Sequence, residues 1–167
     1  TTYFYLGYAD NTTGRGYSTD GTFSTSINLT IVSAGAISGT YSAPGTYAVN
    51  YGSSPVVTAQ AWAGYSVAIS GGCVASGGVG LGASCTVSNM TTAQTVTVTY
   101  TVSTILVSTS AGAGASFTPT TRTVNYGSTT TFTVTPNSGY SISSVTGCGG
   151  SPNGASISAI TYTTGAI

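Results

Sequence analysis

Very few side chains in this chain can support acid–base, nucleophilic or redox chemistry. The charged residues are Asp10, Arg15, Asp20 and Arg122, and the sequence contains no Lys, Glu or His. A serine or cysteine nucleophile would therefore have no imidazole or amine base to activate it. Paired carboxylate chemistry would depend on Asp10 and Asp20, which lie in a Gly-rich stretch where Asp is typical of turns. We expect no catalytic residues and no enzymatic activity.

The same stretch is also the one candidate for a metal site. Asp10, Asn11 and Asp20 supply oxygen atoms of the kind that Ca²⁺ prefers, but they lack the dense acidic spacing of a calcium loop. Roles in turns and caps account for them better. We expect no bound metal and no cofactor.

Three cysteines in a strand-rich chain indicate an oxidising compartment. Cys73 and Cys85 flank the Gly-rich stretch VASGGVGLGAS, which bends easily, so the spacing predicts a Cys73–Cys85 disulfide. In the chain-entropy account a loop of that size stabilises the fold by about 3 kcal/mol. The alternative is two buried, reduced thiols. Cys148 is left as an unpaired or intermolecular thiol.

The composition is nearly free of charge. Charged residues make up 2% of the 167, against roughly 25% in ordinary soluble domains. The chain is nevertheless 40% hydrophobic with 12 tyrosines, which favours a folded protein over a disordered one. A net charge of zero favours self-association. Two arginines are too few for nucleic-acid binding, and no apolar run reaches the roughly 18 residues of a membrane span, so we expect neither nucleic acid nor membrane insertion.

One segment of the sequence occurs twice. The stretch VNYGSSPVVTAQAWAGYSVAISGGC at 49–73 matches VNYGSTTTFTVTPNSGYSISSVTGC at 124–148, and the offset is the same at every matched position, from Val49 to Val124 as from Cys73 to Cys148. Upstream, LTIVSAGAISGTYS from Leu29 resembles ILVSTSAGAGASFT from Ile105, with a shift of a residue or two. Two copies of one unit therefore begin near Ile27 and near Thr104.

The periodicity within each copy is that of strands. Apolar residues alternate with Thr in STTTFTVTP and TVTVTYTV, as in half-buried strands, and the YGS turns place Gly52 and Gly127 where positive φ costs little. The predicted fold class is all-β, with two tandem small β-sandwich or barrel-like modules and an N-terminal strand extension. The predicted boundaries are 1–26 for the extension, 27–103 for the first module and 104–167 for the second.

The stretch SAGAGASFTPTTRTVNYGSTTTFTVTPNSGYSISSVTGCGGS resembles the divergent internalin-type bacterial repeat. Its marks are an apolar opening strand, the YGS turn, an alternating strand, and then GY and GC. The resemblance covers 104–167 well and 27–102 more loosely. It implies a spacer, stalk or adhesive module of a secreted or cell-surface protein, and it brings no catalytic residues.

The second module is predicted to lack its closing strand. By the offset that relates Cys73 to Cys148, the counterpart of Cys85 falls near Ile160, where there is no cysteine, and nothing like TVTVTYTV follows. The uncovered edge would pair with a strand from elsewhere. The N-terminal segment TTYFYLGYA, at 1–9, has high strand propensity and is the candidate donor. The predicted subunit-interface residues are Tyr3, Phe4, Tyr5, Leu6 and Tyr8.

These features predict an extracellular or cell-surface structural protein whose partner is itself, in a filament or surface fibre assembled head-to-tail by β-strand addition. The alternative is an adhesive or glycan-binding repeat region of a larger cell-surface protein, whose own continuation would supply the missing strand. Trp62 is then the candidate ligand-binding residue, because an aromatic ring packs well on the apolar face of a sugar.

Overall fold

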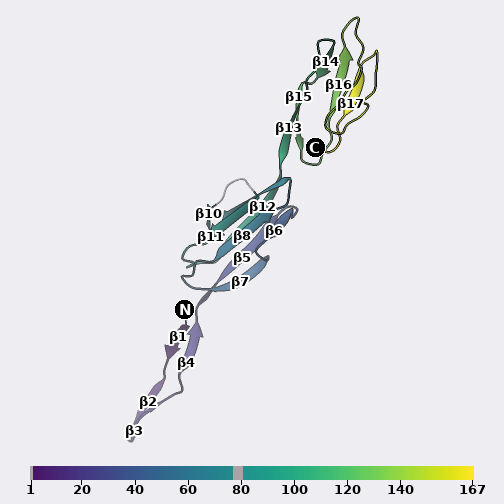
Figure 1. Ribbon diagram of the computed structural model, residues 1–167. Helices are drawn as coiled ribbons and strands as arrows, with labels where there is room; N and C mark the ends of the chain where they lie inside the picture. The colour runs from purple at the N-terminus through teal and green to yellow at the C-terminus, as the bar shows by residue number, and fades with distance from the viewer. Residues whose placement is uncertain (1, 77–80) are drawn as a thin grey trace. The chain divides into compact units, whose positions relative to one another are not determined.

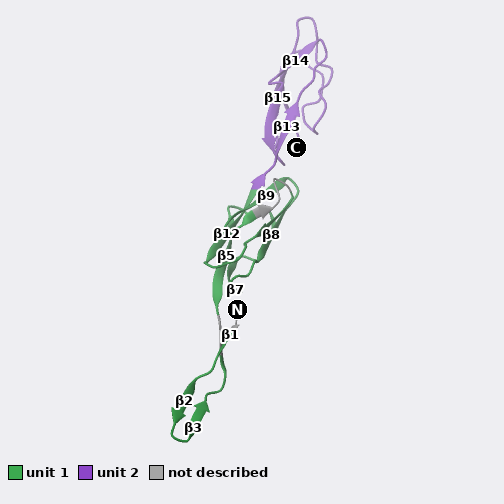
Figure 2. Ribbon diagram, turned by 90° about the vertical axis from the view of Figure 1, so that its left-hand side faces the viewer, with its two compact units in different colours: residues 1–100 green, residues 101–167 purple. Residues whose placement is uncertain are grey.

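The computed structural model describes residues 2–76 and 81–167. Thr1, at the start of the predicted donor strand, and 77–80, in the Gly-rich stretch between Cys73 and Cys85, lie outside the described residues. The described residues form an all-β fold without helices, so none of them belongs to a helix long and apolar enough to cross a membrane. The chain divides into two compact units, residues 1–100 and 101–167 (Figure 2).

The N-terminal extension is a β-hairpin rather than a lone strand. Its strands are β1 (Thr2–Tyr5), β2 (Tyr8–Asn11), β3 (Gly14–Tyr17) and β4 (Gly21–Ser24). Antiparallel pairing joins β1 to β4 and β2 to β3 (Figure 1). The hairpin closes after Asn11, whose side-chain oxygen accepts hydrogen bonds from the Thr13 amide (2.9 Å) and hydroxyl (2.6 Å). This polar turn explains why the charged stretch forms strands instead of a loop.

Residues 26–102 form what we call the first strand set. It comprises β5 (Ser26–Ala34), β6 (Gly39–Tyr41), β7 (Gly45–Asn50), β8 (Val56–Ala61), β9 (Tyr65–Gly71), β10 (Val74–Ser76), β11 (Gly82–Thr86) and β12 (Gln94–Val102). One sheet has the order β10-β11-β8-β6 and the other β7-β5-β12-β9. β5 and β12 run parallel, whereas β5 and β7 run antiparallel. β12 therefore lies in the interior of its sheet.

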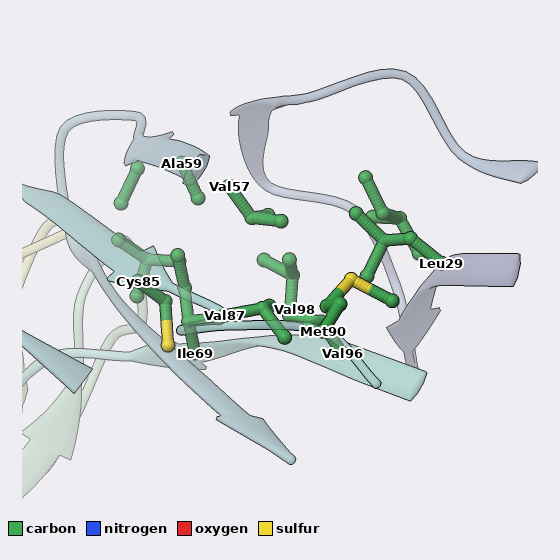
Figure 3. Close-up of a cluster of buried hydrophobic side chains, with 12 residues drawn as sticks. Leu29, Val57, Ala59, Ile69, Cys85, Val87, Met90, Val96 and Val98 are labelled. Carbon is green, nitrogen blue, oxygen red and sulfur yellow. The ribbon is translucent and has the colours of Figure 1, made fainter. Parts of the chain in front are cut away.

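The core of the first strand set depends on β12. Alternation along this strand directs Val96 and Val98 inward, where both are completely buried. They lie in the middle of the core with Met90 (Figure 3). Tyr100 continues the same face, meeting the Tyr41 ring edge-on at 6.5 Å and donating a hydrogen bond to the Thr40 carbonyl (3.0 Å).

Residues 104–163 contain the second strand set. It comprises β13 (Thr104–Ser108), β14 (Ala115–Thr118), β15 (Thr121–Asn125), β16 (Thr131–Pro136) and β17 (Ile160–Thr163). β13 pairs with β15, and the other sheet has the order β14-β16-β17 (Figure 1). The core of this set consists of Val134, Ile142, Val145 and Tyr162, with partly buried neighbours that include Phe117.

Replacing Tyr100 with Phe should change the alkaline stability of the first strand set. Burial, followed by the neighbouring Tyr41, raises the pKa of Tyr100 above its ordinary value of 10.0, so its stabilising effect is present below pH 10 and is lost as the pH rises through the raised pKa. We expect Tyr100→Phe to cost about 1 kcal/mol near neutral pH and to reduce the loss of stability above pH 10. Urea unfolding at a series of pH values measures both effects. An unchanged alkaline profile would contradict this role.

Candidate functional site

Among the described residues, β13 pairs with another strand along one edge only. In the part of the chain that the structure describes, its sheet contains β13 and β15 and no third strand. β5, in the equivalent place of the first strand set, lies between β7 and β12. The amide and carbonyl groups on the second edge of β13 therefore have the arrangement that pairs with an added strand.

Several backbone hydrogen bonds recur at similar positions in the two strand sets. The Tyr51 amide donates to the Thr25 carbonyl, and the Tyr126 amide donates to the Ser103 carbonyl. Strand pairing agrees with this alignment, since Ile27 lies opposite Val49 and Ile105 lies opposite Val124. The offset from β5 to β13 is thus slightly larger than the offset from β7 to β15. Counted between these paired positions, the chain from β13 to β15 is therefore a few residues shorter than the chain from β5 to β7. This difference in length explains the shift in the upstream sequence match.

The correspondence continues to Ile167. Met90 exchanges backbone hydrogen bonds with the turn at Gly52 and Ser53 (2.7 and 2.9 Å), and Ile167 does the same with Gly127 and Ser128 (2.6 and 3.1 Å). β12 begins shortly after Met90, at Gln94. None of the described residues occupies the place of β12 in the second strand set.

Glycines beside this place show that it is open. Gly71 has φ of 112°, and a Cβ there would lie 2.2 Å from the Thr95 carbonyl oxygen, because the β12 backbone passes against it. Gly147 has φ of 121° and lies two residues after buried Val145, as Gly71 lies two residues after buried Ile69. By the sequence offset the counterpart of Gly147 is Gly72, where a Cβ would lie 2.1 Å from the Gln94 side chain of β12. A Cβ on Gly147 would meet nothing within 4 Å. The space taken by a strand backbone beside Gly71 is thus free beside Gly147.

Two adjoining cavities lie between the segment 107–115, which begins in β13, and the segment 140–148. One of about 220 Å³ is lined by the apolar side chains of Val107, Phe117, Phe132, Val145 and Tyr162, and also by Cys148. The other, of about 350 Å³, shares Ser110, Phe117, Val145 and Thr146 with the first and extends to Ile142, and its lining is mixed, with several serines beside the apolar side chains. We call these cavities together the β13 groove. No charged residue lines it.

The position of Cys85 is occupied by Tyr162 in the second strand set. Cys85 pairs with Val57 across β11 and β8, and Tyr162 pairs with Phe132 across β17 and β16. The Tyr162 hydroxyl donates to the Gly147 carbonyl and accepts a hydrogen bond from the Gly150 amide (3.1 Å). A tyrosine thus holds the segment that a disulfide holds in the first strand set.

The cysteines follow from this difference. Cys73 and Cys85 form the predicted disulfide, with Cα atoms 5.7 Å apart. Cys148 is a free, exposed thiol with φ of 46°. The counterpart of Cys85, expected near Ile160, is Tyr162, two residues further along the chain, because the connection before β17 is longer than that before β11. The signal in the sequence was AITYTT, where Tyr162 has the inward phase of a strand.

The predicted interface residues are exposed in the N-terminal hairpin. The exposed fractions are 75% for Phe4, 48% for Leu6 and 63% for Tyr8. Tyr3 and Tyr5 are also exposed, and the Tyr5 ring covers Gly21 on the opposite strand. The hairpin therefore carries an apolar row that its own strands do not bury.

One ion pair crosses the hairpin near its turn. The Asp10 carboxylate accepts two hydrogen bonds from the Arg15 guanidinium (2.6 and 2.8 Å), which lowers the pKa of Asp10 and raises that of Arg15. Arg15 also lies 4.3 Å from the centre of the Tyr8 ring. Both charges are exposed to water, so the pair contributes little to stability.

Trp62, the candidate ligand-binding residue, is 59% exposed. Its amide donates to the Ser38 carbonyl (2.8 Å), as the Asn137 amide does to the Gly114 carbonyl. It lines neither cavity of the β13 groove. Among the described residues, no group of three or more His, Cys, Asp or Glu side chains is arranged to hold a metal ion.

Removing the Tyr162 hydroxyl should loosen the segment around Cys148. Tyr162→Phe deletes two hydrogen bonds at a buried site, which we expect to lower the free energy of unfolding of the second strand set by about 1–2 kcal/mol. Denaturant unfolding measures this loss, and the rate of Cys148 modification by a thiol reagent should rise. Tyr140→Phe, at an exposed ring, is the matched control with an effect of about 0.5 kcal/mol or less. Equal effects of the two substitutions would contradict the role of Tyr162.

Comparison with models of known protein families gave no match to this chain. No curated protein and no solved structure matched it significantly either.

Proposed function

We propose that this protein is an extracellular structural protein, the subunit of a filament or surface fibre that assembles head-to-tail by β-strand addition. In this proposal residues 27–103 and 104–167 are two tandem copies of one β-module, and 1–26 supply the donor strand. The observation that carries the proposal is the edge of β13 that no described strand pairs with, where β5 has β12.

The tandem arrangement is supported by hydrogen bonds that recur at constant spacing. Besides the bonds that align β5 with β13, the turn bond from Ser53 to Asn50 recurs from Ser128 to Asn125. Gly52 and Gly127 have nearly the same φ, 79° and 77°. Each module would thus need a strand in the place of β12, and the first supplies its own.

Strand addition would satisfy two unmet requirements at once. The edge of β13 has backbone donors and acceptors to pair, and the β13 groove has apolar walls to cover. The exposed row of Phe4, Leu6 and Tyr8 has apolar area to bury. Neither the groove lining nor residues 1–9 contain a charged side chain. Binding would therefore carry no desolvation cost for a charged side chain.

The contact joins two different surfaces, so each subunit would both donate a strand and receive one. Contacts of this kind generate open filaments when the rotation between subunits does not close a ring. An extracellular location is supported by the Cys73–Cys85 disulfide and by the resemblance of 104–167 to repeats of secreted and cell-surface proteins. The scarcity of charge removes the repulsion that would oppose close assembly.

Charged substitutions in the exposed row should abolish assembly. In Phe4→Asp/Leu6→Asp, two carboxylates would have to enter the β13 groove, which has no cationic side chain to pair with them, at a cost of several kcal/mol each. We expect polymers from the unaltered chain and monomers from this variant. Light scattering and negative-stain electron microscopy measure the difference.

The matched control adds the same two charges elsewhere. Val74→Asp/Ile157→Asp alters side chains that are 78% and 85% exposed and that line neither cavity of the β13 groove. This variant should assemble as the unaltered chain does. Monomers from the unaltered chain, or polymers from Phe4→Asp/Leu6→Asp, would contradict the proposed function.

A second candidate function, glycan binding by a repeat of a larger surface protein, is supported by the exposed ring of Trp62. It predicts a change in Trp62 fluorescence on addition of oligosaccharides to a monomeric chain. Because Trp62 is the single tryptophan, the signal has one source. A flat titration with a panel of neutral oligosaccharides would exclude this candidate.

A further inference from the structure

We propose that the donated strand enters the β13 groove parallel to β13, with Phe4 and Leu6 in the places that Val96 and Val98 occupy in the first strand set. Tyr8 then follows in the place of Tyr100. This inference rests on the proposed function and adds to it the direction, register and buried face of the donor.

The direction and register come from β12. It runs parallel to β5, with Thr95 opposite Thr30 and Val96 opposite Ile31. Ile31 in turn lies opposite Gly45 on β7. In the second strand set the Thr109 amide donates to the carbonyl of Thr120, which is the counterpart of Gly45 by the offset that relates Val49 to Val124.

Thr109 is therefore the counterpart of Ile31, and Ser108 is that of Thr30. A donor in the register of β12 places Tyr3 opposite Ser108 and Phe4 opposite Thr109.

The spacing of apolar residues in the donor matches that of β12. The inward row of β12 is Val96, Val98 and Tyr100, two aliphatic residues and then a tyrosine at alternate positions. The exposed row of the hairpin has a similar form, with the apolar Phe4 and Leu6 followed by Tyr8. Both rows would bury their first two residues in a core and place a phenol ring at the rim.

Side-chain size is complementary between donor and groove. The large Ile31 faces the small Val96 in the first strand set, whereas the smaller Thr109 would face the larger Phe4 in the second. Leu6 is likewise larger than Val98, and the cavities of about 220 and 350 Å³ provide room for it. The summed side-chain volume of Phe4 and Thr109 would thus be close to that of Val96 and Ile31, as close packing requires.

Other registers fit less well. A slip by one residue would turn Tyr3 and Tyr5 inward and leave the apolar side chains of Phe4 and Leu6 in water.

The place of Tyr8 differs from that of Tyr100 in one respect. A Cβ on Gly39 would lie 2.6 Å from the Tyr100 ring, and the counterpart of Gly39 is Ala115. The Tyr8 ring must therefore lie further from β14.

Releasing the donor from its own hairpin costs little. β1 and β4 form a two-stranded sheet, and isolated two-stranded sheets are marginally stable in water. In this register Thr2 and Tyr3 would lie opposite Val107 and Ser108 of β13, and Phe4 and Tyr5 opposite Thr109 and Ser110 just after it, so the strand edge would replace part of the backbone hydrogen bonding to β4. The contact of Arg15 with the Tyr8 ring would be lost, but it lies at an exposed site.

Pairs of introduced cysteines test the register in the full-length chain. Every variant carries Cys148→Ser, so that the only other cysteines are those of the Cys73–Cys85 disulfide. Tyr3→Cys/Ser108→Cys places thiols at the predicted neighbours, at a Cα separation of about 5 Å that suits a disulfide. Tyr5→Cys/Ser108→Cys, shifted along the same face, is the matched control. After mild oxidation of assembled protein, non-reducing gels separate linked from unlinked chains.

The expected result is a ladder of dimers and larger species for Tyr3→Cys/Ser108→Cys, with at least fivefold less linkage in the control. Filaments that link better through Tyr5→Cys would overturn the register and leave strand addition intact. Filaments that link through neither pair would overturn the assignment of this segment as the donor. A linked monomer would mean that the strand enters its own groove, and absence of filaments from the unaltered chain would contradict the proposed function itself.

Discussion

The hydrogen-bonding capacity of strand edges is the constraint on which the rest of this structure depends. A strand inside a sheet pairs along both edges, and a strand at the end of a sheet leaves one row of amides and carbonyls to other partners. β5 meets this requirement through β12, whereas the described part of the second strand set offers β13 only β15. In the first strand set β12 both pairs with β5 and places Val96 and Val98 in the core, so in the proposed assembly one donated strand would cover both the open edge and the β13 groove.

Near absence of charge makes this arrangement workable. Natural proteins usually protect open edges with lysine or other charges, and here neither β13 nor the groove carries one. Tyr162 contributes in a different way, because its hydroxyl bonds hold Gly147 and Gly150 beside the groove without a disulfide. The groove thus keeps its shape next to a free thiol, Cys148.

Much of the fold followed from local patterns. Alternation of apolar residues with Thr predicted strands such as β12 and β16, the YGS turns predicted positive φ at Gly52 and Gly127, and the spacing of Cys73 and Cys85 predicted their disulfide. The hairpin was not predicted, because its register depends on a turn at Asn11 that has no Asn-Gly or Asp-Gly signal. Parallel pairing of β5 with β12 was also missed, since it depends on contacts between residues distant in the sequence, and the strand phase of Tyr162 does not by itself show that this residue takes the place of Cys85.

Electron cryo-microscopy of the assembled protein, at a resolution that separates strands, tests the central claim most directly. The account predicts a strand lying beside β13, parallel to it, that traces back to the N-terminus of a neighbouring subunit. It also predicts that density for two large apolar side chains fills the space next to Val107, Phe117 and Val145. A bare edge on β13, or a strand there that belongs to the same subunit, would contradict it.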